Sequence, residues 1–515
     1  MESGFPPTAL EPCSIYVHDL HAASGFDLPV AEVPANWEHG QYATELWLQR
    51  ALRRHPWRAE SPEKADVIFV AANFSLACVM SMYKQRALWN KLVADPFLYP
   101  AAGDASTPTD ATKAVAAGGN HNRSSIAIGG GAPPSKFVTF QYAACRPPWQ
   151  LGSRKPSDVV LLKEYVNGDW SRSVVSPFVV SRPPWLVGAG ATTGASTAIV
   201  ATSAAGPAQP VAVAWHARKL VFFAGHVPKP YIRPTRYLLW RQGRRDPRVT
   251  TVSSTLSCQV GAFAKCDLPT DFLKAQNNSF WLTHCHNVCG TTSKCMASRR
   301  ISPKNNMAGF VRACLKMKQG RLMRLANFTA ELPDMIRDTR RVPHGEYLRL
   351  AMSHRFCLIV PGDWVSTHKV TEAMALGGAG GCIPVFVAPG SKVKDIEQAV
   401  TGMLPYTRWH DYCATSYFIS EYAAKLNFSA VLERLERVSE AEATSKLAAL
   451  RRVRDAFVFR REATLERPSA PQFLLGEVCA AARGRRAAVE AKAAAGAAPI
   501  RPKLNLRSCV LGTSS

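Results

Sequence analysis

The stretch 353–387 constrains the fold most, because it combines two short apolar runs with one helix-prone segment. The runs span 356–360 and 382–387, and both have the length of a strand. Between them, 361–364 has the composition of a turn and 366–376 can form a helix, which a glycine-rich bend follows. Two strands around one helix predict a β-α-β unit of a parallel sheet, and therefore an α/β fold.

The start of this helix is a candidate ligand site. In parallel sheets, ligands lie at the carboxyl ends of the strands, next to helix N-termini. Hydroxyls, cations and free backbone N–H groups there suit a phosphate, and this segment offers Ser366, Thr367, His368 and Lys369. Glu372 lies one turn further on and could accept hydrogen bonds from a ribose. An ordinary buried β-α-β unit with a solvated helix start has the same spacing, so the residues alone leave both interpretations open.

The same stretch resembles the signature of the exostosin family, which is glycosyltransferase family 47. The family pattern runs from FCL through a Pro/Gly turn, a Ser-x-Arg element and an acidic residue before Ala to GCIPV. The positions that match are Phe356-Cys357-Leu358, Pro361-Gly362-Asp363, Ser366, Glu372-Ala373 and Gly381-Cys382-Ile383-Pro384-Val385. The chain departs from the pattern where the family has Arg, since His368 and Lys369 stand there, and its glycine bend is longer.

Two further segments resemble the family. The apolar burst at 14–20 resembles the family's opening strand and would place His18 and Asp19 at a strand end, although the residues alone favour a plain strand terminus with a turn-forming Asp. The run 218–226 resembles the family's FFAG element, in which Gly225 would let the backbone turn close to a ligand. Arg218 or Arg233 could reach a pyrophosphate there, or Arg233 could lie on the solvated face of the next helix.

Composition changes suggest where the domains begin and end. A hydrophobic content of 47% in 515 residues is ample for two packed domains. Stretches of Ala, Gly, Ser and Thr predict disordered or linking segments. We expect a first domain over 1–187 with a disordered insert at 101–135, a linker over 188–210, a second domain over 211–480 with a Cys-rich insert at 257–314, and a disordered tail over 481–515.

The chain is strongly basic, with a formal net charge of +25. We expect no nucleic-acid partner, because zinc-finger and RNP-like motifs are lacking and the basic residues are spread along the chain. A basic surface also suits an enzyme that handles nucleotide diphosphates and acidic glycans. No apolar run of about 18 residues is present, so we expect membrane attachment only through an N-terminal anchor that this sequence does not contain.

The 14 Cys residues favour an oxidising compartment. Glycosylation sequons, which point the same way, occur at Asn73, Asn122, Asn277, Asn327 and Asn427. In the Cys-rich insert, Cys285, Cys289 and Cys295 lack the paired Cys-x2-Cys units of zinc sites. Disulfides are therefore favoured there over zinc or free thiols, and we expect no metal site.

The resemblance implies a GT-B architecture, in which two Rossmann-like domains face a cleft. The first domain would bind a glycan acceptor and the second a nucleotide sugar, expected to be a UDP-sugar, with transfer by inversion. His18 and Asp19 are the candidates for the catalytic base. The candidates for donor binding are Gly225, Arg233, Gly362, Ser366, His368, Lys369 and Glu372. No cofactor or metal is expected, the expected compartment is the Golgi or secretory lumen, and a homo- or hetero-oligomer is compatible with all of this.

Two other functions remain as alternatives. A non-catalytic relative that binds glycan or supports an active partner is suggested by the replaced Arg positions. It is also suggested by the segment 135–145, which lacks the Asp-His pair that family members usually carry near there. A basic nucleic-acid binder is suggested by charge alone.

Overall fold

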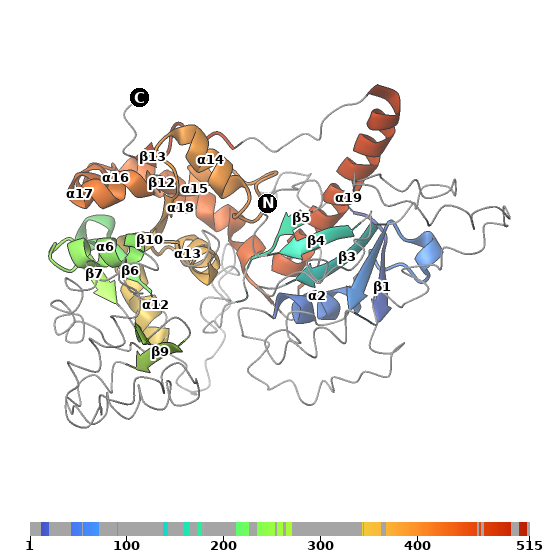
Figure 1. Cartoon of the computed structure of the whole chain (residues 1–515), viewed down its shortest axis with the longest axis horizontal. Coiled ribbons are helices and arrows are strands. Elements are labelled where there is room, and N and C mark those ends of the chain that lie inside the picture. Colours follow the sequence, from blue (N-terminus) through green and yellow to red (C-terminus); the bar gives the residue numbers. More distant parts are fainter. Residues whose placement is uncertain are drawn as a thin grey trace, which may run out of the picture. The chain divides into compact units, whose positions relative to one another are not determined.

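The computed structural model of the chain (Figure 1) describes residues 12–19, 43–53, 55–71, 90, 137–142, 159–163, 173–177, 179, 213–225, 234–252, 255–260, 264–269, 342, 344–361, 367–460, 463–464, 468–495 and 504–511. Its contacts divide the chain into two compact units. The N-terminal unit comprises Pro7–Val179 and Arg461–Arg501, and the C-terminal unit comprises Met1–Pro6, Val180–Arg460 and Pro502–Ser515. Each unit contains a parallel sheet, which confirms the predicted α/β class.

The N-terminal unit is built on a five-stranded parallel sheet whose strands follow one another in sequence order. These strands are β1 (Ile15–Asp19), β2 (Val67–Ala71), β3 (Phe137–Tyr142), β4 (Val159–Lys163) and β5 (Ser173–Val175). Helix α2 (Thr44–Arg53) and the short 3-10 helix η4 (Pro62–Lys64) lie between β1 and β2 in the chain. All five residues of β2, VIFVA, are buried, as expected for a strand with both faces covered.

A long helix from the far end of the sequence completes this unit. Helix α19 (Ala470–Ala495) packs against α2, β4 and β5. Its buried side chains include Phe473, Leu474 and Val478. Cys479 forms a disulfide with Cys13, and the two Cα atoms are 5.6 Å apart. The chain therefore returns to its first sheet after it has built the second unit.

Two of our domain expectations need correction. The second domain was expected to run to residue 480, but Arg461–Arg501 belongs to the N-terminal unit. A disordered tail was expected over 481–515, but α19 continues to Ala495 and a short strand, β13 (Val510–Leu511), follows. The expected insert at 101–135 and the linker at 188–210 lie outside the described residues.

The C-terminal unit is built on a six-stranded sheet in the order β13-β12-β11-β10-β6-β7, and every neighbouring pair is parallel. Besides β13, the strands are β6 (Lys219–Ala224), β7 (Val249–Val252), β10 (His354–Ile359), β11 (Ile383–Ala388) and β12 (Tyr417–Ser420). The unit's helices are η7 (Trp215–Ala217), α6 (Pro234–Gly243), α12 (His344–Met352), α13 (His368–Gly378), α14 (Val393–Thr401), α15 (Tyr412–Thr415), α16 (Glu421–Leu426), α17 (Phe428–Glu436), α18 (Glu440–Val453) and η9 (Arg454–Phe457).

The predicted β-α-β unit is present as β10, α13 and β11, with Phe356 paired to Ile383 and Leu358 to Val385. All residues of α13 from Val370 to Gly378 are buried. The helix packs against α18, where an added Cβ on Gly377 would come within 2.6 Å of the Leu450 side chain. Gly377 and Gly378 therefore belong to α13, and their lack of a Cβ lets the helix lie close to α18.

The strand order of this sheet contains a topological switch. The chain passes from β6 outward to β7, and later returns to place β10 on the other side of β6. Open α/β sheets bind ligands at such a switch point, at the carboxyl ends of the flanking strands, which here are β6 and β10. The expected site on α13 follows β10 directly, so it borders this position.

Two disulfides hold the C-terminal unit. Cys357 on β10 is bonded to Cys382, which directly precedes β11, with Cα atoms 5.4 Å apart. Cys413 in α15 is bonded to Cys509, with Cα atoms 5.3 Å apart, and this bond fastens the segment that carries β13. With Cys13–Cys479, these bonds confirm that the chain forms disulfides, and they suggest an oxidising, secretory-type compartment.

The Cys-rich insert is described only in part. An antiparallel hairpin of β8 (Thr255–Val260) and β9 (Ala264–Pro269) places Cys258 opposite Cys266. The other cysteines of the insert lie outside the described residues.

Candidate functional site

Two helices start at the carboxyl edge of the C-terminal sheet, next to the switch point. Helix α6 follows β6 in the chain and α13 follows β10, so both N-termini lie at the edge where β6 and β10 end. The N-terminus of a helix carries a partial positive charge and unpaired N–H groups, which favour an anion. The candidate site is the set of side chains around these two helix starts.

A compact three-residue cluster lies beside the start of α13. The Lys369 Nζ atom is 2.6 Å from Glu372 Oε2, and the Tyr347 hydroxyl donates to the same carboxylate oxygen at 2.8 Å. The Lys369 ammonium also lies 3.8 Å from the centre of the Tyr347 ring. The Lys369 side chain is 22% exposed and that of Glu372 only 4%. We call these three residues the Tyr347 cluster.

Electrostatics keep Glu372 ionised despite its burial. Burial alone would raise the pKa of this carboxyl, but the charges of Lys369 and His368 and the hydrogen bonds from Lys369 and Tyr347 lower it to about 2. Burial and the neighbouring Glu372 raise the pKa of Tyr347 well above its usual value, so the phenol stays protonated and donates. An ammonium has three N–H donors, and one bond to Glu372 leaves others for a second acceptor.

The start of α13 is partly capped by its own chain. Thr367 is the N-cap, and its hydroxyl oxygen accepts from the Lys369 N–H at 3.1 Å. The Val370 N–H donates to the Thr367 carbonyl at 2.9 Å. Two of the N–H groups that a phosphate could use are therefore already bonded, and the His368 and Lys369 side chains become the more important cationic groups at this helix start.

Arg236 is a basic group at this edge that the sequence analysis did not single out. It lies in the first turn of α6, and its Nη2 and Nε donate to the Val360 carbonyl at 3.0 and 3.3 Å. Val360 directly follows β10, so these bonds hold the guanidinium at the switch point. The preceding residue, Thr235, hydrogen-bonds the Glu421 carboxylate. The strand order brings Arg236 here, and strand order could not be read from local sequence.

Arg218, by contrast, lies at the opposite edge of the sheet. Its Nη1 donates to the Gly381 carbonyl at 2.9 Å and its Nε to the Val213 carbonyl at 2.8 Å. Arg218 precedes β6 and Gly381 precedes β11, so both lie where these parallel strands begin. The residue ties two backbone segments together and is far from the carboxyl edge along the strands.

The remaining predicted site residues are placed as follows. Gly225 directly follows β6, and an added Cβ there would make only an ordinary contact, at 3.9 Å from the Phe223 ring, so the backbone itself does not require glycine. Arg233, Gly362 and Ser366 lie outside the described residues. His18 and Asp19 end β1 at the carboxyl edge of the other sheet, and the His18 side chain is half-buried.

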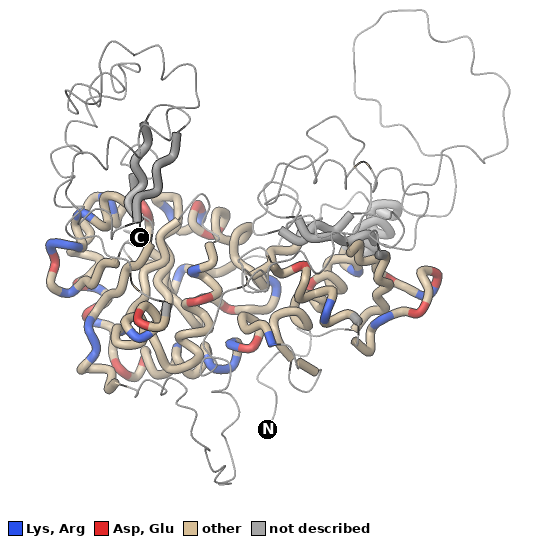
Figure 2. Tube along the Cα trace, turned by 90° about the horizontal axis from the view of Figure 1, so that it is seen from below, with Lys and Arg blue, Asp and Glu red and all other residues tan. Residues whose placement is uncertain are grey.

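The described residues hold neither a metal cluster nor a membrane span. Within the described ranges there is no group of three or more His, Cys, Asp and Glu side chains that could hold a metal ion. No described helix is both long and apolar enough to cross a membrane. Figure 2 shows that the described Lys and Arg residues are distributed over many segments, with Asp and Glu among them.

Comparison of the chain with models of known protein families and with curated protein sequences found no match.

Proposed function

We propose that the C-terminal unit binds a nucleotide sugar at the carboxyl edge of its sheet and that the chain is an inverting glycosyltransferase. The observation that carries the proposal is the Tyr347 cluster. An ordered ammonium, held by a buried carboxylate, borders the switch point of a parallel sheet and lies inside the stretch that resembles the exostosin signature. The proposed donor is a UDP-sugar, and the proposed acceptor is a polysaccharide or glycoprotein glycan.

The proposed chemistry needs positive charge where the leaving group departs. The acceptor oxygen forms a bond to the anomeric carbon, and the bond from that carbon to the diphosphate oxygen breaks with inversion. The diphosphate leaves with the electron pair, so fixed cations and dipoles that face it lower the barrier. In this proposal Lys369, His368 and Arg236 supply that charge. Glu372 positions Lys369, because its carboxylate is buried and bonded to both other members of the cluster.

The acceptor proton needs a base on the opposite face of the sugar. His18 and Asp19 are the proposed candidates, since both end a strand at the carboxyl edge of the N-terminal sheet. In this proposal that unit presents the acceptor, and the two units form a GT-B-like cleft in the Golgi or secretory lumen.

Calorimetric titration tests donor binding. The full chain is titrated with UDP, GDP and a panel of UDP- and GDP-sugars, and products of transfer to glycan acceptors are followed by mass spectrometry. We expect one class of nucleotide to bind. Lys369→Ala should weaken the affinity for that nucleotide at least tenfold, which corresponds to about 1.4 kcal/mol. Lys394→Ala, an exposed lysine of α14, is the matched control and should leave affinity unchanged. Absence of both nucleotide binding and transfer would refute the proposal.

A second candidate function, a non-catalytic glycan-binding or partner-supporting protein, is favoured by one observation. Lys369 stands where the family has Arg, and its charge is compensated by Glu372 at 2.6 Å. A compensated lysine attracts a diphosphate less strongly than the bidentate fork of an arginine. This function predicts that the chain binds glycan but no nucleotide. Lys369→Ala would then leave the affinity for glycan unchanged.

A further inference from the structure

One glycosylation sequon falls within the described residues, and its surroundings are specific. Asn427-Phe428-Ser429 joins α16 to α17, while Asn73, Asn122, Asn277 and Asn327 lie outside the described residues. Asn427 and Ser429 are exposed, whereas Phe428 between them is only 2% exposed. A buried anchor therefore holds the two functional residues of the tripeptide at the surface.

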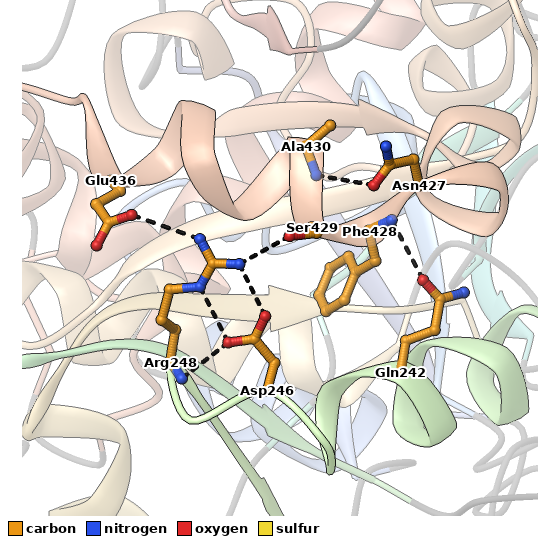
Figure 3. Close-up of polar contacts among 8 residues, drawn as sticks. All are labelled: Gln242, Asp246, Arg248, Asn427, Phe428, Ser429, Ala430 and Glu436. Atoms are coloured by element: carbon orange, nitrogen blue, oxygen red, sulfur yellow. Dashed lines mark hydrogen bonds and ion pairs between the residues drawn. The ribbon is translucent and has the colours of Figure 1, made fainter.

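The helix cap fixes which amide atom of Asn427 faces outward. Asn427 is the N-cap of α17, and its side-chain oxygen Oδ1 accepts from the Ala430 N–H at 3.0 Å. A backbone N–H can bond only to an acceptor, so Oδ1 faces the helix and the nitrogen Nδ2 faces away. Figure 3 shows this arrangement, in which the Asn427 amide nitrogen points away from the bond to Ala430.

The other contacts of the tripeptide come from the preceding part of the unit. The Phe428 N–H donates to Gln242 Oε1 at 3.2 Å, and Ser429 Oγ accepts from Arg248 Nη2 at 2.9 Å (Figure 3). Arg248 is itself held by Asp246 at 2.8 Å. None of these bonds uses the Asn427 nitrogen, and the residue is exposed.

Helix α16, which directly precedes Asn427, carries two exposed apolar side chains. Tyr422 is 61% exposed and Leu426 is 67% exposed, and their spacing of four residues puts them on one face of the helix. Leu426 directly precedes Asn427. This exposed apolar side chain beside the sequon is a surface that a bulky polar group attached nearby can cover.

We propose that Asn427 carries an N-linked glycan. The sequon is the acceptor motif for this modification in secreted chains, and the disulfides suggest such a compartment. In the reaction, the amide nitrogen Nδ2 forms a bond to the anomeric carbon of a lipid-diphosphate-linked oligosaccharide. The bond from that carbon to the diphosphate oxygen breaks, the lipid diphosphate leaves with the electron pair, and the amide gives up one proton. The proposal is independent of the chain's own activity.

Peptide mapping tests the proposal directly. The full chain is produced behind a cleavable leader in the secretory pathway of a eukaryotic cell and is then treated with peptide-N-glycosidase in heavy-oxygen water, which converts a glycosylated Asn into labelled Asp. Trypsin cuts after Lys425 and Arg434, so the peptide 426–434 contains no other sequon. We expect most copies of this peptide to carry the label. Recovery of the peptide mainly unlabelled from secreted, disulfide-bonded protein would overturn the proposal, whether or not other sequons are labelled.

Two substitutions separate the glycan from the helix cap. Asn427→Asp removes the acceptor nitrogen but keeps an oxygen that can cap α17. Asn427→Gln moves the amide one carbon further out, so it is not an acceptor for the glycan and is not a preferred N-cap. We expect both variants to lose the same mass from the secreted protein, and only the Gln variant to lose Tm in unglycosylated protein. If the mass of the secreted protein is unchanged by Asn427→Asp, Asn427 is not modified.

Discussion

The ion pair between Lys369 and Glu372 has its carboxylate almost fully buried. Such a carboxylate relies on its partners, because a charge taken out of water without compensation costs several kcal/mol. Tyr347 and Lys369 supply the compensation through bonds of 2.8 and 2.6 Å to one oxygen. The cluster is therefore a structural element of the C-terminal unit, whatever ligand the unit binds.

Removal of the lysine charge should destabilise the C-terminal unit. We expect Lys369→Met to lower the free energy of unfolding by about 2–3 kcal/mol, since Glu372 would keep only its bond to Tyr347 while the partly exposed lysine moderates the loss. The measurement is chemical denaturation at neutral pH. Lys394→Met, an exposed lysine of α14, serves as the control and should change stability by less than about 0.5 kcal/mol. Adding Glu372→Gln to Lys369→Met should recover part of the loss, and a double variant weaker than the single one would contradict this account.

Stability should fall in mild acid because His354 is buried in its neutral form. Burial lowers the pKa of His354 to about 4, although its ring Nδ1 lies 2.6 Å from the Leu350 carbonyl. The unfolded chain, with a His pKa near 6.5, takes up the proton first as pH falls, so stability is full above about pH 6.5 and decreases towards pH 4. The shift corresponds to about 3 kcal/mol.

His354→Asn provides the test, because an Asn side-chain nitrogen can still donate to the Leu350 carbonyl but does not titrate. We expect denaturation curves between pH 6.5 and 4 to show a shallower loss of stability in this variant than in the parent chain. The parent slope should remain partly present, since burial also lowers the pKa of His410, to about 3. Identical slopes in the two proteins would show that His354 is already protonated or is solvated in the folded state.

At the scale of the elements, α13 depends on two glycines that pack against α18 and η9. An added Cβ on Gly377 would approach the Cys382 carbonyl oxygen to 2.9 Å, and one on Gly378 would approach the Leu450 carbonyl oxygen to the same distance. Backbone atoms cannot move aside as a side-chain tip can. Close approach of the helix to its neighbours therefore requires residues without a Cβ at both positions.

Gly377→Ala should consequently destabilise the C-terminal unit by about 1–3 kcal/mol, the usual cost of overpacking. Gly345→Ala in α12 is the matched control, because an added Cβ there meets nothing within 4 Å. The control should be neutral or stabilising by up to about 1 kcal/mol, since Ala favours a helix over Gly. Thermal unfolding of the two variants side by side decides the matter, and equal Tm values would mean that α13 can shift away from α18 without loss.

These glycines also show what the sequence could predict. Apolar runs and turn residues were sufficient to place β10, α13 and β11 to within two residues at most of their ends. The end of α13 was misplaced because Gly377 and Gly378 read locally as a bend, whereas packing against Leu450 and Arg454 keeps them helical. Arg236 was missed for a different reason: its position at the switch point follows from strand order, which local patterns do not contain.

Helix α19 shows the same limit of local sequence patterns. Residues 481–495 are rich in Ala and Arg, which are good helix formers, but without a visible apolar stripe they read as a fraying tail. What holds α19 is its earlier half, through buried Phe473 and Leu474, and the bond from Cys479 to Cys13. Disulfide connectivity cannot be deduced from sequence alone.

At the scale of the whole molecule, the chain alternates between its two units. Arg461–Arg501 belongs to the N-terminal unit, and Pro502–Ser515 returns to the C-terminal unit. Neither unit is therefore a continuous piece of sequence. A boundary placed near residue 180 separates the two sheets but does not separate two independently complete domains.

Removal of the C-terminal residues should show that the N-terminal unit needs them to fold. A chain that ends at residue 460 lacks α19 and the disulfide partner of Cys13, and the loss of a native disulfide alone costs about 2–5 kcal/mol. We expect its N-terminal unit to be unfolded, detected as rapid limited proteolysis between residues 12 and 179. A chain that ends at residue 501 keeps α19, so its N-terminal unit should resist the protease, and only the C-terminal unit should weaken through loss of β13. Protease resistance of 12–179 in the shorter chain would refute the dependence on α19.

The position of β13 also has a consequence for biosynthesis. This strand pairs with β12 but follows α19 in the chain, so the ribosome must deliver the whole of that helix before the six-stranded sheet can be finished. During synthesis, one domain normally folds before the next domain emerges from the ribosome. Here both units stay incomplete until α19 and β13 have been synthesised, and the disulfide between Cys413 and Cys509 can form only after residue 509 has left the ribosome.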